Sequence, residues 1–387
     1  MSLERAEQLL PVEAYTTDAW LDRERRGIFS RAWTFAALES DLDAPGAYRV
    51  VSCGPSSIIV LRDQEGALRA FHNICRHRGT ELLEGRGKLG RTIVCPYHKW
   101  TYGLDGRLMG LPEQKACFPG LDKGRLGLHG AALASLKGMI FVHPDAEPAI
   151  PFEDWIAPLE GALWPHDFEA MTEGPPLLYV MRCNWKVFFE NAIDGYHLAY
   201  LHEKSIGGPS PSENLWERHG RHLLWYSTEG GRKSSLPAAS AEAMAGGGKI
   251  KGAESGAYAG VTMLYPATIV TASPYEFSVG TLIPLSPDLT RLHIRGWGKR
   301  ASGWFGGAST AESGADEEPE AVRLEALEGH PMESGDFMLE DLWICEKIQR
   351  SMRSRFYGVG DLAQGPGCES PLAWFQAQLL EDLGEAA

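Results

Sequence analysis

The spacing of hydrophobic positions changes along the chain. Within the first forty residues, apolar side chains recur at three- to four-residue steps, as in 20–33, which predicts amphipathic helices over 1–40. Further on, short apolar runs such as 57–61 and 68–71 are separated by a polar turn, and this pattern predicts short strands. We therefore expect a small all-β domain over 41–148.

The carboxy-terminal part combines longer alternating segments with helical ones. Residues 276–283 and 291–295 alternate in polarity, as half-buried antiparallel strands do. We expect an α+β domain over 149–387, with one curved antiparallel sheet around a cavity and with the amino-terminal helices packed on it. Two stretches rich in glycine and small or acidic residues, 228–256 and 302–319, predict long loops. The first of them is a candidate substrate lid.

Composition and charge exclude several classes of protein. With 387 residues, 44% of them hydrophobic, the chain can support two cores. A net charge of −14 argues against a nucleic-acid partner, because phosphate binding needs a basic surface. No apolar stretch approaches the ~20 residues of a membrane span, and the amino terminus lacks the order of a signal peptide. Seven cysteines, an odd number, fit a reducing compartment, so we expect a cytoplasmic protein without a membrane partner.

Two short segments each offer one thiolate and one imidazole. They are Cys75-Arg-His77 and Cys95-Pro-Tyr-His98. In a Rieske [2Fe–2S] cluster two cysteines hold one iron and two histidines hold the other. A Cys2His2 zinc site uses the same four ligands, but zinc modules usually open with paired cysteines or paired histidines. The repeated Cys-before-His order favours the cluster over zinc.

A second group of metal-binding side chains follows at Asp194, His197 and His202. Two histidines and one carboxylate on one face of a metal leave positions open for oxygen and substrate, the facial triad of non-heme Fe(II) oxygenases. On a regular helix His197 and His202 would lie about 140° apart. The helix must therefore unwind, end or bulge between them if both bind one ion. The alternative is that His202 is an ordinary surface histidine.

The predicted helix 337–352 offers three carboxylates, Glu340, Asp341 and Glu346. Helical spacing places Asp341 on the same stripe as apolar residues that include Ile348, whereas Glu346 falls on the opposite side. Burying an unpaired carboxylate is costly, so an inward Asp341 needs a cation. The pattern therefore makes Asp341 a candidate metal ligand, and Glu340 is a further candidate.

These motifs resemble the large (α) subunits of Rieske non-heme iron oxygenases, also called aromatic-ring-hydroxylating oxygenases. The matching segments are 71–79, 95–102 and 184–202, and the resemblance is thin between about 205 and 330. It implies that the Rieske [2Fe–2S] domain precedes a helix-grip (START-like) catalytic domain that holds the mononuclear iron. It also implies cofactors: the cluster held by Cys75, His77, Cys95 and His98, an Fe(II) ion, O2 as co-substrate, and NAD(P)H acting indirectly through a reductase.

The resemblance also implies roles for individual residues. Asp341 corresponds to the third iron ligand, beside His197 and His202. Asp194 corresponds to a carboxylate that bridges two subunits, accepting hydrogen bonds from His197 and from the cluster histidine, His98, of a neighbouring subunit. Asn191 resembles a polar residue near the iron. Such partners orient the ligand rings and tune their basicity.

Partners and reaction are likewise implied by the resemblance. We expect a terminal oxygenase that receives electrons from a separate reductase or ferredoxin and forms a head-to-tail homotrimer, α3 or α3β3 with a separate β subunit. It would act as a monooxygenase or dioxygenase, hydroxylating or dealkylating a small substrate. An aromatic compound or aromatic acid is preferred, which suggests aromatic hydrocarbon catabolism. The alternatives are a quaternary-amine (choline-, betaine- or carnitine-type) monooxygenase or demethylase, and a non-catalytic Rieske electron-transfer protein.

The cluster loops differ from those of respiratory Rieske proteins. Gly79 and Tyr97 stand where those proteins typically have extra cysteines, and Trp100 stands where they have a serine that bonds a bridging sulfide. Fewer hydrogen bonds to the cluster imply a lower reduction potential. Lys99 departs from the oxygenases, which commonly have glycine there, and adds a positive charge beside His98.

Side chains on the predicted strands offer two kinds of substrate contact. A quaternary amine is typically bound by an aromatic cage, and an aromatic acid by a cationic side chain that anchors its carboxylate. The cage candidates are Trp225, Tyr226, Tyr258, Tyr265 and Trp297, and the anchor candidates are Arg291 and Arg295.

Overall fold

The computed structural model contains two compact units. The larger unit comprises Met1–Arg23 and Ile156–Ala387, and the smaller unit comprises Glu24–Trp155. The described residues are 6–160, 173–205, 216–227, 259–272, 276–298, 319–365 and 367–384. The candidate lid 228–256 lies outside them, and so does all of the predicted loop 302–319 except its last residue.

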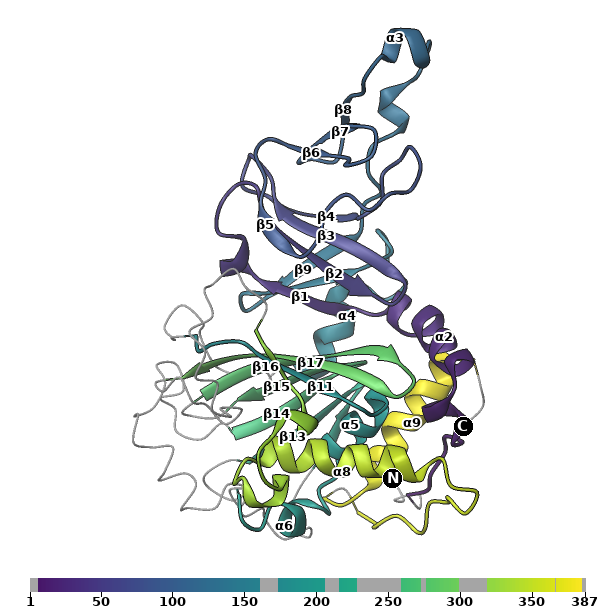
Figure 1. The fold of residues 1–387 in the computed structure, drawn as a ribbon, viewed down its shortest axis with the longest axis vertical. Helices are drawn as coiled ribbons and strands as arrows, with labels where there is room; N and C mark the ends of the chain where they lie inside the picture. Colours follow the sequence, from purple (N-terminus) through teal and green to yellow (C-terminus); the bar gives the residue numbers. More distant parts are fainter. Residues whose placement is uncertain are drawn as a thin grey trace. The chain divides into compact units, whose positions relative to one another are not determined.

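The smaller unit consists mainly of three antiparallel sheets (Figure 1). One has the order β1 (Thr34–Leu38), β10 (Met139–His143), β9 (Ala132–Leu136). The next has the order β4 (Leu68–His72), β3 (Ser56–Arg62), β2 (Ala47–Cys53), β5 (Arg86–Lys88). The third has the order β6 (Thr92–Val94), β7 (Thr101–Gly103), β8 (Leu108–Gly110). Its short helices are α3 (Gln114–Cys117) and most of α4 (Phe152–Ile156).

Strand β3 explains why this unit has two hydrophobic clusters. Its residues Ile58 to Leu61 are all buried. Because successive side chains of a strand point to opposite faces, Ile58 and Val60 join one cluster and Ile59 and Leu61 join the other. The second cluster also contains Cys75 and Cys95. The two cysteine-histidine loops are therefore anchored in a packed core, the first after β4 and the second between β6 and β7.

The larger unit is built on one eight-stranded sheet (Figure 1). Its order is β12 (Trp216–His219), β13 (His222–Ser227), β14 (Ala259–Leu264), β15 (Thr268–Ala272), β16 (Glu276–Ser286), β17 (Leu289–Gly298), β11 (Leu177–Met181), β18 (Ala321–Val322). All neighbouring pairs are antiparallel except β11 and β18. The α+β prediction is confirmed, and the parallel edge pair corrects the expectation of a wholly antiparallel sheet.

Helices lie along one face of this sheet (Figure 1). The described ones are α1 (Glu13–Thr16), α5 (Trp185–Ala192), α6 (Leu198–Leu201), α8 (Phe337–Ser351) and α9 (Ser370–Asp382). Helix α5 packs against α8. Asn184 and Asp336 cap the amino termini of α5 and α8, where their side chains accept backbone N–H bonds. None of the described helices combines the length and apolarity needed to cross a membrane.

The amino-terminal region is helical only in part. Helices α1 and α2 (Asp18–Gly27) agree with the predicted periodicity. Residues Thr34–Leu38 instead form strand β1, because they pair with β10 from a distant part of the sequence. Within the larger unit the Tyr15 hydroxyl donates to Glu190 Oε1 on α5 at 2.7 Å. This bond connects the start of the chain to α5, a helix of the same unit.

Candidate metal centres

The two cysteine-histidine loops share one backbone pattern. In the first, the Cys75 amide donates to the Thr80 carbonyl (2.8 Å) and the Gly79 amide donates to the Cys75 carbonyl (3.0 Å). In the second, the Cys95 amide donates to the carbonyl five residues later (2.8 Å) and the Lys99 amide donates to the Cys95 carbonyl (3.1 Å). Each loop therefore turns tightly around its cysteine, and the two loops present equivalent ligand positions.

The side chains at these positions converge. Both Cys75 and Cys95 are buried and unpaired, and the rings of His77 and His98 lie 4.6 Å apart between centroids. Burial raises the pKa of the Cys75 thiol, and the neighbouring Cys95 thiol adds to the rise. Burial, with the charge of His98, lowers the pKa of His77. Its buried Nδ1 has no hydrogen-bond partner, so a lone pair is available to a metal. Two thiols and two imidazoles fit the predicted cluster.

Two aromatic side chains surround this site. The Tyr102 hydroxyl accepts a bond from the Arg76 amide at 3.0 Å and lies 3.3 Å from Cys75 Sγ. Its proton is therefore free to point at the sulfur. Trp100 stacks on His77 at 4.8 Å with a 6° angle between the rings, so it fixes the imidazole by packing. Sequence reasoning missed the contact between Tyr102 and Cys75, although Tyr102 lies within the motif.

The second site begins where α5 ends. His197 precedes the one-turn helix α6, and His202 directly follows it. The helical turn ends at Leu201, directly before His202, which confirms the prediction that the helix must unwind, end or bulge if both histidines bind one ion. This break lets both imidazoles turn to the same side despite their five-residue spacing.

Three ligand atoms meet there. His197 Nε2 and His202 Nε2 are 3.2 Å apart, and Asp341 Oδ1 on α8 lies 3.1 Å from His202 Nε2 and 3.6 Å from His197 Nε2. With metal–ligand bonds of about 2.1 Å, ligand atoms at right angles lie about 3 Å apart. The three atoms thus suit a single ion bound from one side. The structure brings together the three residues proposed as iron ligands.

Glu340 occupies a different position from the one expected for a ligand. It is fully buried, and its Oε2 accepts bonds from His202 Nδ1 at 2.7 Å and from the Ser205 hydroxyl at 2.6 Å. It therefore touches the ring nitrogen that faces away from Asp341. Burial opposes the charging of His202, but the Asp341 and Glu340 carboxylates raise its pKa to about 9. For the Asp341 carboxyl, burial alone would raise the pKa. The neighbouring His202 outweighs burial, so the pKa is lowered.

The two remaining predicted residues lie beside the ligands. Asn191 Nδ2 donates to Asp341 Oδ1 at 2.8 Å, the same oxygen that faces both histidines. Asp194 Oδ2 lies 3.4 Å from His197 Nδ1 without hydrogen-bond geometry. Its Oδ1 accepts the Tyr196 amide at 2.6 Å. Asp194 is thus placed behind the His197 ring, and Asn191 restrains the carboxylate.

Two expectations for α8 are wrong. Glu346 is buried rather than solvated, because its Oε1 accepts the Arg182 amide at 3.0 Å. Ile348 is 36% exposed rather than inward. Helical periodicity places residues on a stripe, but it does not say which neighbouring element covers that stripe.

Some of the side chains predicted to contact substrate make other contacts or are buried. Arg295 pairs with Glu173 through two bonds of 2.6 and 2.7 Å, and its guanidinium lies 5.5 Å from the Trp297 ring centre. Trp225 and Tyr265 are buried. The Tyr226 and Tyr258 side chains lie outside the described part of the structure.

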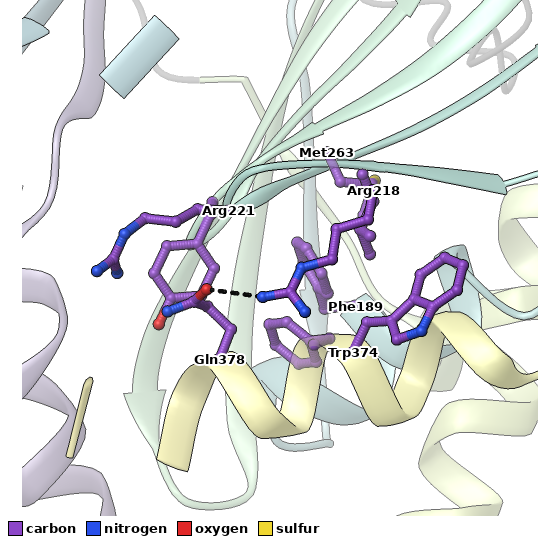
Figure 2. A pocket seen from close by; sticks show the side chains of 9 residues that line it. Phe189, Arg218, Arg221, Met263, Trp374 and Gln378 are labelled. Atoms are coloured by element: carbon purple, nitrogen blue, oxygen red, sulfur yellow. Dashed lines mark hydrogen bonds between the residues drawn. The ribbon is translucent and has the colours of Figure 1, made fainter. Parts of the chain in front are cut away.

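A narrow cavity lies between β12, β13, β14, α5 and α9. It is too small for a substrate. It is lined in part by Phe189, Arg218 and Arg221, and the Arg218 guanidinium donates to Gln378 Oε1 at 3.3 Å (Figure 2). Its volume of about 10 Å³ is about that of one water. None of its lining residues belongs to the metal site.

The position of Glu340 makes a testable prediction. Glu340→Gln keeps the size of the side chain but removes the charge that faces His202 Nδ1. We expect affinity of the His197–His202–Asp341 site for Fe(II) to fall by about 10- to 100-fold, as for other partners of ligand histidines. Competition with a chelator measures the Fe(II) affinity. The control is Glu333→Gln, a substitution of an exposed glutamate that precedes α8. An unchanged affinity would remove Glu340 from the site.

Family models match both parts of the chain. The Rieske [2Fe-2S] domain matches residues 32–134, and the ring hydroxylating alpha subunit (catalytic domain) matches residues 168–384. The first match decides between the cluster and zinc. The second covers more than half of the chain and includes the three residues proposed as iron ligands.

Individual relatives divide by substrate. The glycine betaine monooxygenase oxygenase subunit of Chromohalobacter salexigens is 36% identical over 205 residues, which are 51% of this chain and 44% of that protein. The naphthalene 1,2-dioxygenase large oxygenase component of Pseudomonas putida is 35% identical over 189 residues, 47% of this chain and 42% of that protein. These matches cover less than half the length of each relative.

A solved structure supports the fold across the chain. Naphthalene 1,2-dioxygenase with indole bound superposes with a TM-score of 0.73 at 20% identity, covering 99% of this chain and 94% of that one. The two domain matches, in this order along one chain, establish the family. The chain belongs to the Rieske non-heme iron oxygenase α subunits.

Proposed function

We propose that this protein is the terminal oxygenase component of a multicomponent system that hydroxylates or dealkylates a small organic substrate. The observation that carries the proposal is that one chain presents a Cys2His2 loop pair and a His2Asp group with three ligand atoms 3.1–3.6 Å apart. When bound, the cluster and the mononuclear iron would supply single electrons and oxygen activation. A reductase or ferredoxin fed by NAD(P)H would be the electron donor.

The residues of the mononuclear site would divide the work. His197, His202 and Asp341 would hold Fe(II) from one side and leave the opposite side open for substrate. Glu340 would accept a hydrogen bond from the protonated Nδ1 of His202 and so fix the tautomer that presents Nε2 to the metal. Asn191 would hold the Asp341 carboxylate in place through the same oxygen that faces the histidines.

We propose a head-to-tail trimer, α3 or α3β3, for the assembled protein. Asp194 lies behind His197, and a carboxylate there could accept a bond from His98 of a neighbouring subunit. This would connect the cluster loops of one subunit with the mononuclear site of the next, and such a heterologous contact closes into a ring. The odd cysteine count, with two assigned to the cluster, supports a reducing, cytoplasmic location.

For the substrate we propose an aromatic compound or an aromatic acid. The similarity to naphthalene dioxygenase components supports this choice. A methylated quaternary amine is the second candidate, and the similarity to glycine betaine monooxygenase subunits favours it. Arg295, one of the two cationic anchors predicted for an aromatic acid, pairs with Glu173.

A panel of substrates tests the proposal. Purified protein should carry three irons per chain and show the Rieske visible spectrum. With a surrogate reductase, aromatic acids should stimulate oxygen uptake and yield hydroxylated or dealkylated product. Stimulation by methylated ammonium compounds alone would assign the second candidate. Two irons per chain, or zinc alone, with no stimulated uptake would indicate a non-catalytic electron-transfer or metal-binding protein.

A further inference from the structure

Lys99 has an unusual backbone for a lysine. Its φ is +56°, and the equivalent position of the first cluster loop is Gly79, with a φ of +75°. Both residues donate their amide to the loop cysteine four positions earlier. The shared turn therefore requires left-handed backbone, which glycine adopts without strain and lysine does not. The second loop thus carries a lysine side chain at a position whose backbone favours glycine.

The Lys99 side chain keeps its charge close to the loop. Its ammonium donates to the Pro96 carbonyl at 3.3 Å, and Pro96 directly follows the ligand Cys95. The side chain is exposed, but this bond folds it back along the ligand loop. The charge is thereby held beside His98 and Cys95.

A second cation lies on the other loop. Arg78 donates to the Tyr97 hydroxyl at 3.1 Å, and its guanidinium lies 5.4 Å from the centre of the Tyr97 ring. The Tyr97 ring in turn lies against His98, with 3.6 Å between centroids. Both loops thus place a positive charge at the exposed edge of the ligand set.

No carboxylate offsets these charges within the loops. Residues 74–79 and 94–99 contain Arg76, Arg78 and Lys99 and no aspartate or glutamate, although the whole chain has a net charge of −14. The local excess of positive charge is therefore a property of the cluster loops.

We propose that Lys99, together with Arg78, raises the reduction potential of the cluster. This inference rests on the proposed function, which places the cluster between Cys75, His77, Cys95 and His98. Reduction adds one electron to the cluster, and nearby positive charge stabilises the more negative state. One charge roughly 10 Å away in a water-like dielectric changes the equilibrium constant for reduction about twofold. The two cations would partly offset the low potential expected from Trp100 replacing a hydrogen-bonding serine.

Substitutions at Lys99 separate the charge from the backbone. Lys99→Gln removes the charge and keeps a side chain on left-handed backbone, Lys99→Gly removes both charge and strain, and Lys99→Arg keeps the charge. Lys137 is a matched control, because it is also an exposed lysine with positive φ (+49°) but lies in the turn between β9 and β10, in another sheet. The midpoint potential is measured on the whole protein by dye-mediated titration, followed by the Rieske visible spectrum.

We expect Lys99→Gln and Lys99→Gly to lower the equilibrium constant for reduction about twofold at low salt. Lys99→Arg and Lys137→Gln should match the wild type. High salt should reduce the differences, because exposed charges are screened. Of these four variants, only Lys99→Gly should gain thermal stability from relief of backbone strain.

Unchanged potential in Lys99→Gln, with an intact spectrum, would overturn the inference and leave the proposed function standing. Slower reduction by the donor protein at unchanged potential would also overturn it, and would assign the two cations to docking of an acidic partner. Absence of the Rieske spectrum from the wild-type protein would overturn the proposed function as well.

Discussion

Replacing Asp341 with asparagine should remove the mononuclear iron and lower substrate-stimulated oxygen uptake by more than about 100-fold. This loss is larger than the loss of up to about 100-fold expected when a hydrogen-bond partner of a ligand histidine is replaced. Asp341 Oδ1 forms a triangle with the two Nε2 atoms, at 3.1 Å from that of His202 and 3.6 Å from that of His197. Asparagine keeps the shape but lacks the negative charge that Fe(II) and the buried His202 require. Iron content should fall from three to two per chain with the Rieske spectrum unchanged.

The matched control for this variant is Asp145→Asn, a substitution of an exposed aspartate. It should keep three irons and full activity. Retention of three irons by Asp341→Asn would mean that the third ligand is another residue. Thermal melting of the apo proteins distinguishes loss of the ion from loss of the fold.

Replacing Cys95 with serine should abolish the cluster and all reductase-dependent turnover. Cys95 is 1% exposed within the core of the smaller unit, and a serine hydroxyl is a poor substitute for a thiolate in iron–sulfur binding. The visible spectrum should disappear and two of the three irons should be lost. The mononuclear site, built from another unit of the chain, should still bind one Fe(II).

Cys117→Ser is the control for the cysteine variant, because Cys117 is an exposed free thiol. It should keep the spectrum, the iron content and the activity. A Cys95→Ser protein that retained the Rieske spectrum would contradict the assignment of the cluster ligands. The double variant Cys75→Ser, Cys95→Ser, with circular dichroism as a readout of folding, separates ligand loss from collapse of the domain.

Part of the candidate site could be read from local sequence. Ligand chemistry depends on residue type and short spacing, so the two cysteine-histidine pairs predicted a cluster that the family match confirms. The 3.6-residue period of a helix required a break between His197 and His202, and α6 ends at Leu201. The same period, with the cost of burying a carboxylate, made Asp341 a candidate ligand, and the family resemblance placed it ahead of Glu340.

Other features depended on contacts between distant residues. Glu340 binds His202 across 138 positions, and Glu346 is buried because it accepts the Arg182 amide. Strand β1 forms within a helical-looking segment because β10 pairs with it. Tyr102 reaches Cys75 only after both loops have folded onto the same core.

The sequence by itself determined the ligand types, the order of the two domains and the interruption of the helix, because each follows from side-chain chemistry or from a fixed local period. Only the tertiary structure decided which carboxylate faces the metal and which orients a histidine. It also decided that Lys99 adopts left-handed backbone. These outcomes depend on packing and hydrogen bonds between residues far apart in the chain, which no local pattern encodes.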